Sequence, residues 1–153
     1  MRTLFTDEWS LIGTIDPDKV VSSPASNQLT DAIDMADYDQ VAFVFAFGNM
    51  DGAADTVTCS VVQSDASGGT YKAVTNASAT ALTGSPNQDD SQVIITVDEH
   101  ALDMDNDYRY VKGQVALAGG TTGTDITVMA FGRAKHKPAS DADLSSVAEI
   151  VNV

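Results

Sequence analysis

The chain of 153 residues lacks, or has few of, the residue types on which several protein classes depend. It has a single cysteine, Cys59, so no intramolecular disulfide can form, and the position of Cys59 in an alternating apolar run predicts a small buried side chain. Basic residues number 8 against 22 acidic ones, which gives a formal net charge of -14. Because so acidic a chain is repelled by nucleic acid and by anionic membranes, we expect neither as a partner.

Long hydrophobic runs are also missing. No stretch approaches the roughly 20 apolar residues that cross a bilayer as a helix. The opening "MRTLFTDEWSLIG" has no continuous apolar segment of the kind found in a signal peptide. We therefore expect synthesis in a reducing cytoplasm, without secretion.

Glutamate is scarce, because only Glu8, Glu99 and Glu149 among the acids are Glu and the rest are Asp. Asp favours turns and caps over helix and strand interiors, so this acid set indicates many connections and few long helices. The dominant period of the apolar residues is two, which is typical of strands. The alternating segments are "VAFVFAFG", "TVTCSVVQ", "QVIITVD", "VKGQVALAGG" and "DITVMAFGR". Turn-rich segments separate them, and this order predicts an all-β fold, an antiparallel β-sandwich of jelly-roll-like type.

The segment "VAFVFAFG", residues 41–48, is apolar on both of its faces. Its large side chains, Val41 and three phenylalanines, share one face and predict the sandwich core. Its small side chains, Ala42, Val44 and Ala46, share the other face, where a solvated sheet would carry polar residues. We expect this second face to be covered either by an arm of the chain or by a neighbouring subunit.

The two ends of the chain differ from the middle and divide the sequence into three parts. Residues 1–27 are expected to form an extended N-terminal arm, residues 28–138 the single β-sandwich domain, and residues 139–153 a short C-terminal tail. Ser140 and Asp143 resemble a capping box at the start of a helix. After them the apolar residues Leu144, Val147 and Ile150 or Val151 recur at helical spacing, which is typical of a short helix in that tail. The ends either strap the core of the protein itself or reach a partner. The candidate interface residues are Leu4, Phe5, Trp9, Leu11, Ile12, Leu144, Val147, Ile150 and Val151.

Catalytic patterns are not found in the sequence. There is no nucleophile elbow, phosphate-binding glycine loop or paired Cys and His, so we expect a protein that is not an enzyme and that needs no cofactor. One stretch begins with the spacing of a calcium loop, with aspartates at its first, third and fifth positions, Asp103, Asp105 and Asp107. The rest of the pattern is missing, because Tyr108 stands where the loop requires glycine and Gln114 where it requires glutamate. The three aspartates are thus weak metal candidates, and they are also the only starting point for a dispersed Asp-based hydrolase.

The order of several segments resembles a known class. The chain is similar to the small β-rich virion proteins of tailed bacteriophages, often head-decoration or capsid cement proteins. The segments that carry the resemblance are "DMADYDQVAFVFAFG", "VVQSD", "YKAV", "YRYVKGQV" and "VMAFGRAKHKP", which together span most of residues 30–138. The resemblance implies a structural protein located on the virion capsid, bound to the major capsid protein and to copies of itself, as a homotrimer over a three-fold position.

One alternative function belongs to a different class. A carbohydrate-binding β-sandwich of a phage tail or a cell surface would need aromatic side chains gathered on one face. Tyr38, Tyr71, Tyr108 and Tyr110 are available, but nothing in the sequence indicates that they cluster. Binding to an array of glycans distinguishes this function from capsid decoration.

Overall fold

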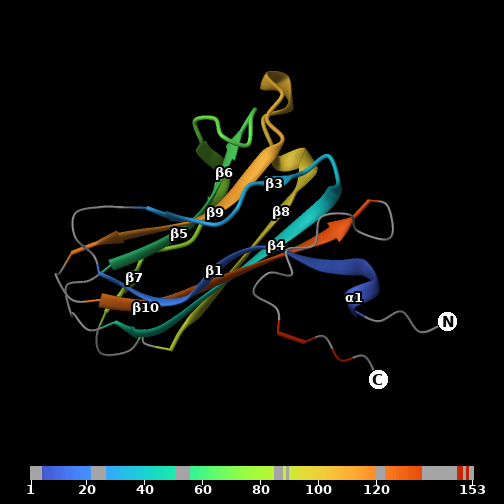
Figure 1. The fold of residues 1–153 in the computed structure, drawn as a ribbon. Helices are drawn as coiled ribbons and strands as arrows, with labels where there is room; N and C mark the ends of the chain where they lie inside the picture. Colours follow the sequence, from blue (N-terminus) through green and yellow to red (C-terminus); the bar gives the residue numbers. More distant parts are fainter. Residues whose placement is uncertain are drawn as a thin grey trace.

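A computed structural model gives the fold of the chain. It describes residues 5–21, 27–50, 56–84, 88, 90–119, 123–135, 148, 149 and 151. The described part is all-β, with two antiparallel sheets packed face to face, and this confirms the predicted β-sandwich (Figure 1). Its helical segments are short: α1 is Phe5–Glu8, and the two 3₁₀ turns are η1, Glu99–Ala101, and η2, Met104–Asn106.

Four strands form the first sheet, sheet A, in the order β1-β10-β4-β8. These strands are β1, Trp9–Val21; β10, Gly123–Ala134; β4, Tyr38–Met50; and β8, Gln92–Asp98. Sheet B has the order β2-β9-β5-β6, with β3 also paired to β9 and β7 also paired to β5. Its strands are β2, Gln28–Leu29; β3, Ile33–Asp34; β5, Thr56–Ser64; β6, Lys72–Ser78; β7, Leu82–Thr83; and β9, Tyr110–Ala118.

The connectivity of the described strands is that of a jelly roll. Short strands β2 and β3 fill one position beside β9, and β6 and β7 fill one position beside β5. Counted in this way, sheet A contains the first, eighth, third and sixth strand positions, and sheet B the second, seventh, fourth and fifth. In this arrangement the first strand, β1, pairs with the last, β10, and the middle strands β5 and β6 pair with each other, as in two interlocked Greek keys.

The core lies between the two inner faces. The face of "VAFVFAFG" that carries the large side chains lies in this core, as the sequence predicts. Val41, Phe43 and Phe45 are fully buried, and Phe47 is 3% exposed. Sheet B contributes a matching row from β5 and β9 that includes Val57, Val61, Val111 and Val115. Each such side chain stabilises the fold by about 1.5–3 kcal/mol when it is fully removed from water.

Strand β1 pairs with β10 from Trp9↔Arg133 to Val21↔Gly123. Residues 1–27, which were expected to form an arm, therefore include a strand of sheet A. Two register shifts, between Leu11 and Gly13 and between Ile15 and Asp18, interrupt the alternation of β1. Bulges of this kind bend an edge strand, and they are also sites where a proline such as Pro17 is tolerated.

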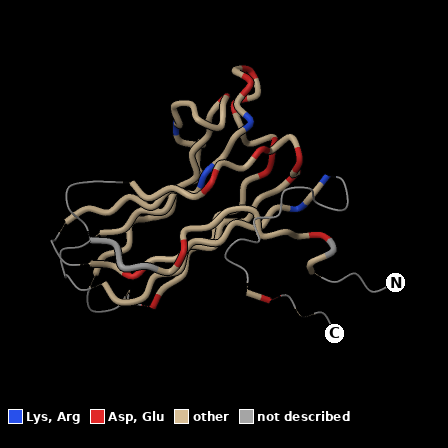
Figure 2. Tube along the Cα trace, in the orientation of Figure 1, with Lys and Arg blue, Asp and Glu red and all other residues tan. Residues whose placement is uncertain are grey.

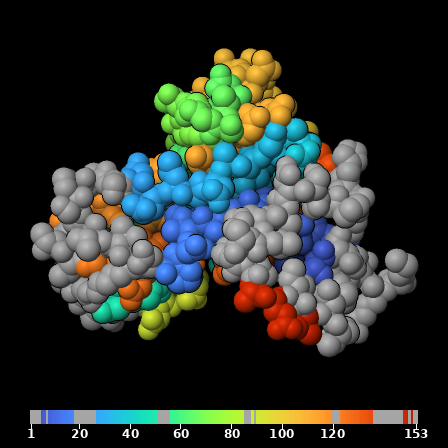
Figure 3. Space-filling view, in the orientation of Figure 1, coloured from blue at the N-terminus to red at the C-terminus, as the bar shows by residue number. Residues whose placement is uncertain are grey.

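Charged residues concentrate at one end of the sandwich, in the connections that follow β3, β5 and β8, while the centres of most strands carry none (Figure 2). At this end the turn after β5 and the η2 turn project together above the body of the molecule (Figures 1 and 3). Lys72, at the start of β6, donates to the Asp103 carboxylate beside η2 at 2.5 Å, and this ion pair joins the two projections. The acid-rich turns are thus fixed to one another by oppositely charged side chains.

Candidate functional site

The outer face of sheet A, which points away from the core, is largely apolar. Two rows of side chains cross it through the strand register. One row is Thr14, Met129, Val44 and Ile94, and the next is Leu11, Phe131, Ala42 and Thr96. The exposed fractions of Ile94 and Met129 are 68% and 36%. Exposed apolar surface that continues across a whole sheet is characteristic of a surface that contacts another molecule.

One end of this face is partly covered by α1. The Phe5 ring stacks on Trp9 with centroids 6.2 Å apart and meets the Phe131 ring edge-on at 5.6 Å. Phe5 itself is 60% exposed. The aromatic cluster of Phe5, Trp9 and Phe131 therefore covers part of β10 and still presents an open apolar surface.

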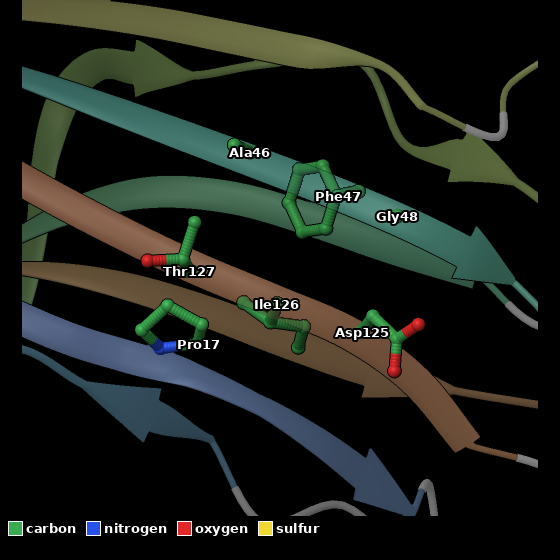
Figure 4. Close-up of a pocket in the computed structure, with 7 residues that line it drawn as sticks. All are labelled: Pro17, Ala46, Phe47, Gly48, Asp125, Ile126 and Thr127. Atoms are coloured by element: carbon green, nitrogen blue, oxygen red, sulfur yellow. The ribbon is translucent and has the colours of Figure 1, made fainter.

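The other end of the face is hollowed. A depression of about 500 Å³ is lined by residues of β1, β4 and β10, namely Pro17, Ala46, Phe47, Gly48, Asp125, Ile126 and Thr127 (Figure 4). The outward residues here, Ala46, Gly48 and Thr127, are small, and Gly48 packs closely against β10, since an added Cβ would lie 3.1 Å from the Asp125 Cβ. The outer face of sheet A thus runs from an aromatic projection to a shallow depression.

The charged end of the sandwich is held by ion pairs between segments far apart in the sequence. Arg133 donates two hydrogen bonds to the Asp39 carboxylate, at 2.9 and 3.0 Å. Arg109 pairs with Asp34, and Lys135 pairs with Glu99. The hydrogen bond from Lys72 lowers the pKa of Asp103, and a bond from Asn106 adds to the effect. A second cavity of about 470 Å³ at this end includes the Arg109 and Lys135 side chains in its lining, so its cations already have carboxylate partners.

Neither cavity is lined by the cysteine, and the described part of the chain holds no cluster of metal ligands. Cys59 lies in the core at 1% exposure, and burial raises the pKa of its thiol to about 12, so the thiolate that attacks or ligates is absent near neutral pH. No group of three or more His, Cys, Asp or Glu side chains among the described residues is placed to hold a metal ion. None of the helices within the described ranges is long and apolar enough to cross a membrane.

The three weak metal candidates lie in or beside the η2 turn. Asp103 accepts from Lys72 and from the Asn106 amide. Asp105 is an exposed residue of η2, and Asp107 closes this turn with a left-handed φ of 57°. The stretch that resembled a calcium loop is therefore a 3₁₀ turn whose first carboxylate is already paired.

The predicted interface residues fall into three groups. Phe5, Trp9 and Leu11 lie on or beside the outer face of sheet A. Ile12 points into the core at 6% exposure, so it offers almost no surface of its own to a partner. Val151 is 69% exposed and lies in no strand or helix. Leu4, Leu144, Val147 and Ile150 lie outside the described residues, as does most of the tail in which a short helix was expected.

Sequence reasoning missed three members of the surface, Ile94, Met129 and Phe131. A signal for them exists, since "QVIITVD" and "DITVMAFGR", like "VAFVFAFG", carry apolar residues on both of their faces. Their meeting on one face depends on the strand order β10-β4-β8, which joins segments distant in the sequence.

Comparison of the chain with protein-family models, with curated proteins and with solved structures finds no match. The chain's own surface chemistry, together with the resemblance described above, therefore has to indicate its function.

Proposed function

We propose that this protein is a non-enzymatic structural component of a tailed-bacteriophage virion, which decorates the capsid exterior and stabilises it. It binds the major capsid protein and neighbouring copies of itself through the outer face of sheet A. The observation that carries the proposal is the pair of apolar rows across that face, with Ile94 and Met129 exposed in a chain of net charge -14. Burial of this surface stabilises a complex by roughly 25 cal/mol per Å² before the cost of association.

The segments that resemble decoration proteins agree with this assignment. "DMADYDQVAFVFAFG" spans part of β3 and most of β4, "YRYVKGQV" enters β9, and "VMAFGRAKHKP" covers the second half of β10. Strands β4 and β10 are the two central strands of sheet A, so two of the resembling segments supply its apolar outer face. Jelly rolls serve viral capsids and also lectins, so the topology supports the proposal by analogy alone.

A homotrimer is the proposed assembly. Its copies follow the local three-fold symmetry of the shell, and the aromatic projection and the hollow at opposite ends of one face allow a head-to-tail contact that closes as a ring. Function then requires association only, with no cofactor, no nucleic acid and no membrane. The protein is made in the host cytoplasm and is located on the virion.

Co-sedimentation with undecorated head shells of the phage that encodes the chain tests the proposal. We expect saturation at a fixed ratio to the major capsid protein. Ile94→Ser and Met129→Ser should each weaken binding about tenfold, because each removes apolar contact worth roughly 1.4 kcal/mol or more from the centre of the interface.

Leu29→Ser is the matched control, because Leu29 is also an exposed aliphatic residue, 42% exposed, but lies on sheet B. It should bind shells like the unaltered chain. Binding that never saturates, or equal binding by all three variants, rejects the outer face of sheet A as the capsid contact.

A further inference from the structure

Three of the four tyrosines gather on sheet B, far from the apolar face. Tyr38 is a core residue at 2% exposure, but Tyr71, Tyr108 and Tyr110 are partly exposed at the charged end. Tyr110 pairs in register with Ser64 of β5, and Tyr71 immediately precedes Lys72, the partner of Gln63. Lys112 lies over the Tyr71 ring and follows Tyr110 at an alternate position of β9, so both rings lie on the outer face of sheet B, near the fully buried Ser64. The pKa of Tyr71 is raised by burial and then by the nearby Tyr110, which agrees with this placement.

Each of these rings has a cation beside it. Lys72 lies 4.1 Å from the Tyr108 ring centroid, Arg109 5.1 Å from Tyr110, and Lys112 4.8 Å from Tyr71. Tyr71 also donates its hydroxyl hydrogen to the Ser67 carbonyl at 2.8 Å. These contacts hold the rings in fixed positions, which lowers the entropy lost when a ligand packs against them.

Polar groups continue from the tyrosines along the same face. Lys112 and Gln114 follow Tyr110 at alternate positions of β9, and Gln114 pairs in register with Ser60. Lys72 and Arg109 are paired with carboxylates, but Lys112 has no carboxylate partner among the described residues, and the side chains of Gln114 and Ser60 make no hydrogen bond to any of them. Partly exposed donors and acceptors thus lie in line with two fixed rings.

Rings that offer a flat apolar surface next to donors and acceptors with no hydrogen-bond partner among the described residues match the chemistry of a sugar, which has C–H faces and a rim of hydroxyl groups. We infer that the outer face of sheet B, at Tyr71, Tyr110, Lys112 and Gln114, is a binding site for an uncharged oligosaccharide. The two tyrosines pack against successive sugar rings, and Lys112 and Gln114 hydrogen-bond their hydroxyls. This site goes beyond capsid decoration and uses the opposite sheet, so both surfaces can be occupied together.

An uncharged ligand fits better than an acidic one. The chain carries a net charge of -14, and at this end only Lys112 among the described cations at the tyrosines lacks a carboxylate partner. A polyanion would meet the field of the surrounding aspartates, whereas a neutral sugar does not.

Titration of the full chain with maltohexaose, cellohexaose and chitohexaose, followed by saturation-transfer NMR, tests the site. We expect at least one neutral hexasaccharide to saturate, with contacts to tyrosine ring protons. Tyr110→Ala and Lys112→Ala should each weaken that binding about tenfold, and Tyr110→Phe, which keeps the ring, should restore most of it.

Met129→Ser, on the other sheet, is the control and should leave sugar binding unchanged. A hexamer of mannuronate serves as the acidic probe. If the neutral sugars fail to saturate below about 10 mM, if only the acidic hexamer binds, or if the Tyr110 and Lys112 variants bind like the unaltered chain, the inference is wrong. Shell binding is measured separately, so failure here leaves the capsid proposal untouched.

Discussion

Gly132 shows how a single absent side chain permits the inner packing of sheet A. A Cβ at this position would lie 2.4 Å from the Ile12 Cδ1 and 2.5 Å from the Tyr38 Cδ1, both of which are core atoms. Gly132→Ala should therefore force these side chains apart and lower the free energy of unfolding by about 1–3 kcal/mol. Urea denaturation measures the change.

Gly68 provides the matched control, because a Cβ there would meet nothing within 4 Å. Gly68→Ala should leave the free energy of unfolding within about 1 kcal/mol of the unaltered chain. Equal midpoints for the Gly132 and Gly68 variants would contradict the close packing at β10.

Cys59 gives the protein a predictable response to alkaline pH. Its thiol has a pKa of about 12 in the fold because of burial, against an ordinary value of 9.0. Between these values the unfolded chain loses the thiol proton and the folded chain keeps it. The contribution of Cys59 to stability is therefore fully present below pH 9 and falls as the pH rises, with a limiting slope of about 1.4 kcal/mol per pH unit.

Cys59→Ala removes this titration and leaves the other groups in place. The difference in free energy of unfolding between the unaltered chain and the variant should shrink from pH 9 upward, and urea melts at a series of pH values measure it. Parallel curves for the two chains would mean that the thiol ionises as readily in the fold as in the unfolded chain.

At the scale of elements, β1 and α1 differ in what they contribute to the fold. β1 supplies Ile12 to the core and covers one edge of β10, whereas α1 places Phe5 against Trp9 and Phe131 at the outer face of sheet A. Deletion of residues 1–8 should leave cooperative unfolding intact. Deletion of residues 1–21 should cost at least the ~2–5 kcal/mol that accompanies truncation of one buried aliphatic side chain.

Circular dichroism during thermal unfolding compares the two deletions. The deletion of residues 1–8 controls for the loss of the chain end, because both proteins lack it. If the chain without residues 1–21 melts at the temperature of the shorter deletion, β1 is an arm resting on the sandwich and not a strand that the fold requires.

The central strands were predictable because their alternation is strict. β9 keeps a period of two along its length and β4 does so from Val41 to Phe47, so the buried residues Phe43, Phe45 and Val115 follow from the sequence alone. Residues 1–27 are predicted to form an extended arm because of their scattered apolar residues, two prolines and small polar residues. In the structure this range contains β1, whose alternation is interrupted by two bulges, with Leu11 on the outer face and Ile12 in the core. A bulge depends on the partner strand, so the local sequence does not reveal it.

The candidate surfaces were predictable only in part, for the same reason. The small face of "VAFVFAFG" indicated that something covers β4, but Ile94 and Met129 join it through pairings with residues far away in the sequence. Tyr71 and Tyr110 are likewise brought together by β5, which lies between them in the sheet. The sequence pattern of a strand identifies the side chains on each of its faces. The order of strands in the sheet decides which of these side chains become neighbours on one surface.

At the scale of the whole molecule, the two sheets present opposite chemistry to their surroundings. Across its centre sheet A shows Val44, Ile94 and Met129, while sheet B shows Lys112, Gln114 and Ser60 at equivalent outward positions. Charge is concentrated in the end loops, so copies that meet through sheet A bury an uncharged centre. The net charge of -14 on each copy nevertheless repels the other at long range.

Self-association through sheet A should therefore strengthen as salt is added. Raising NaCl from about 0.01 M to about 0.1 M shortens the screening length from roughly 30 Å to roughly 10 Å, which weakens the repulsion and leaves the apolar contact unchanged. Sedimentation equilibrium should show a larger association constant at the higher salt, with Ile94→Ser and Met129→Ser remaining weaker than Leu29→Ser at both concentrations. An association constant that falls with salt would mean that oppositely charged groups hold the copies together, and the contact would then have to lie at the charged end loops and not on the apolar face.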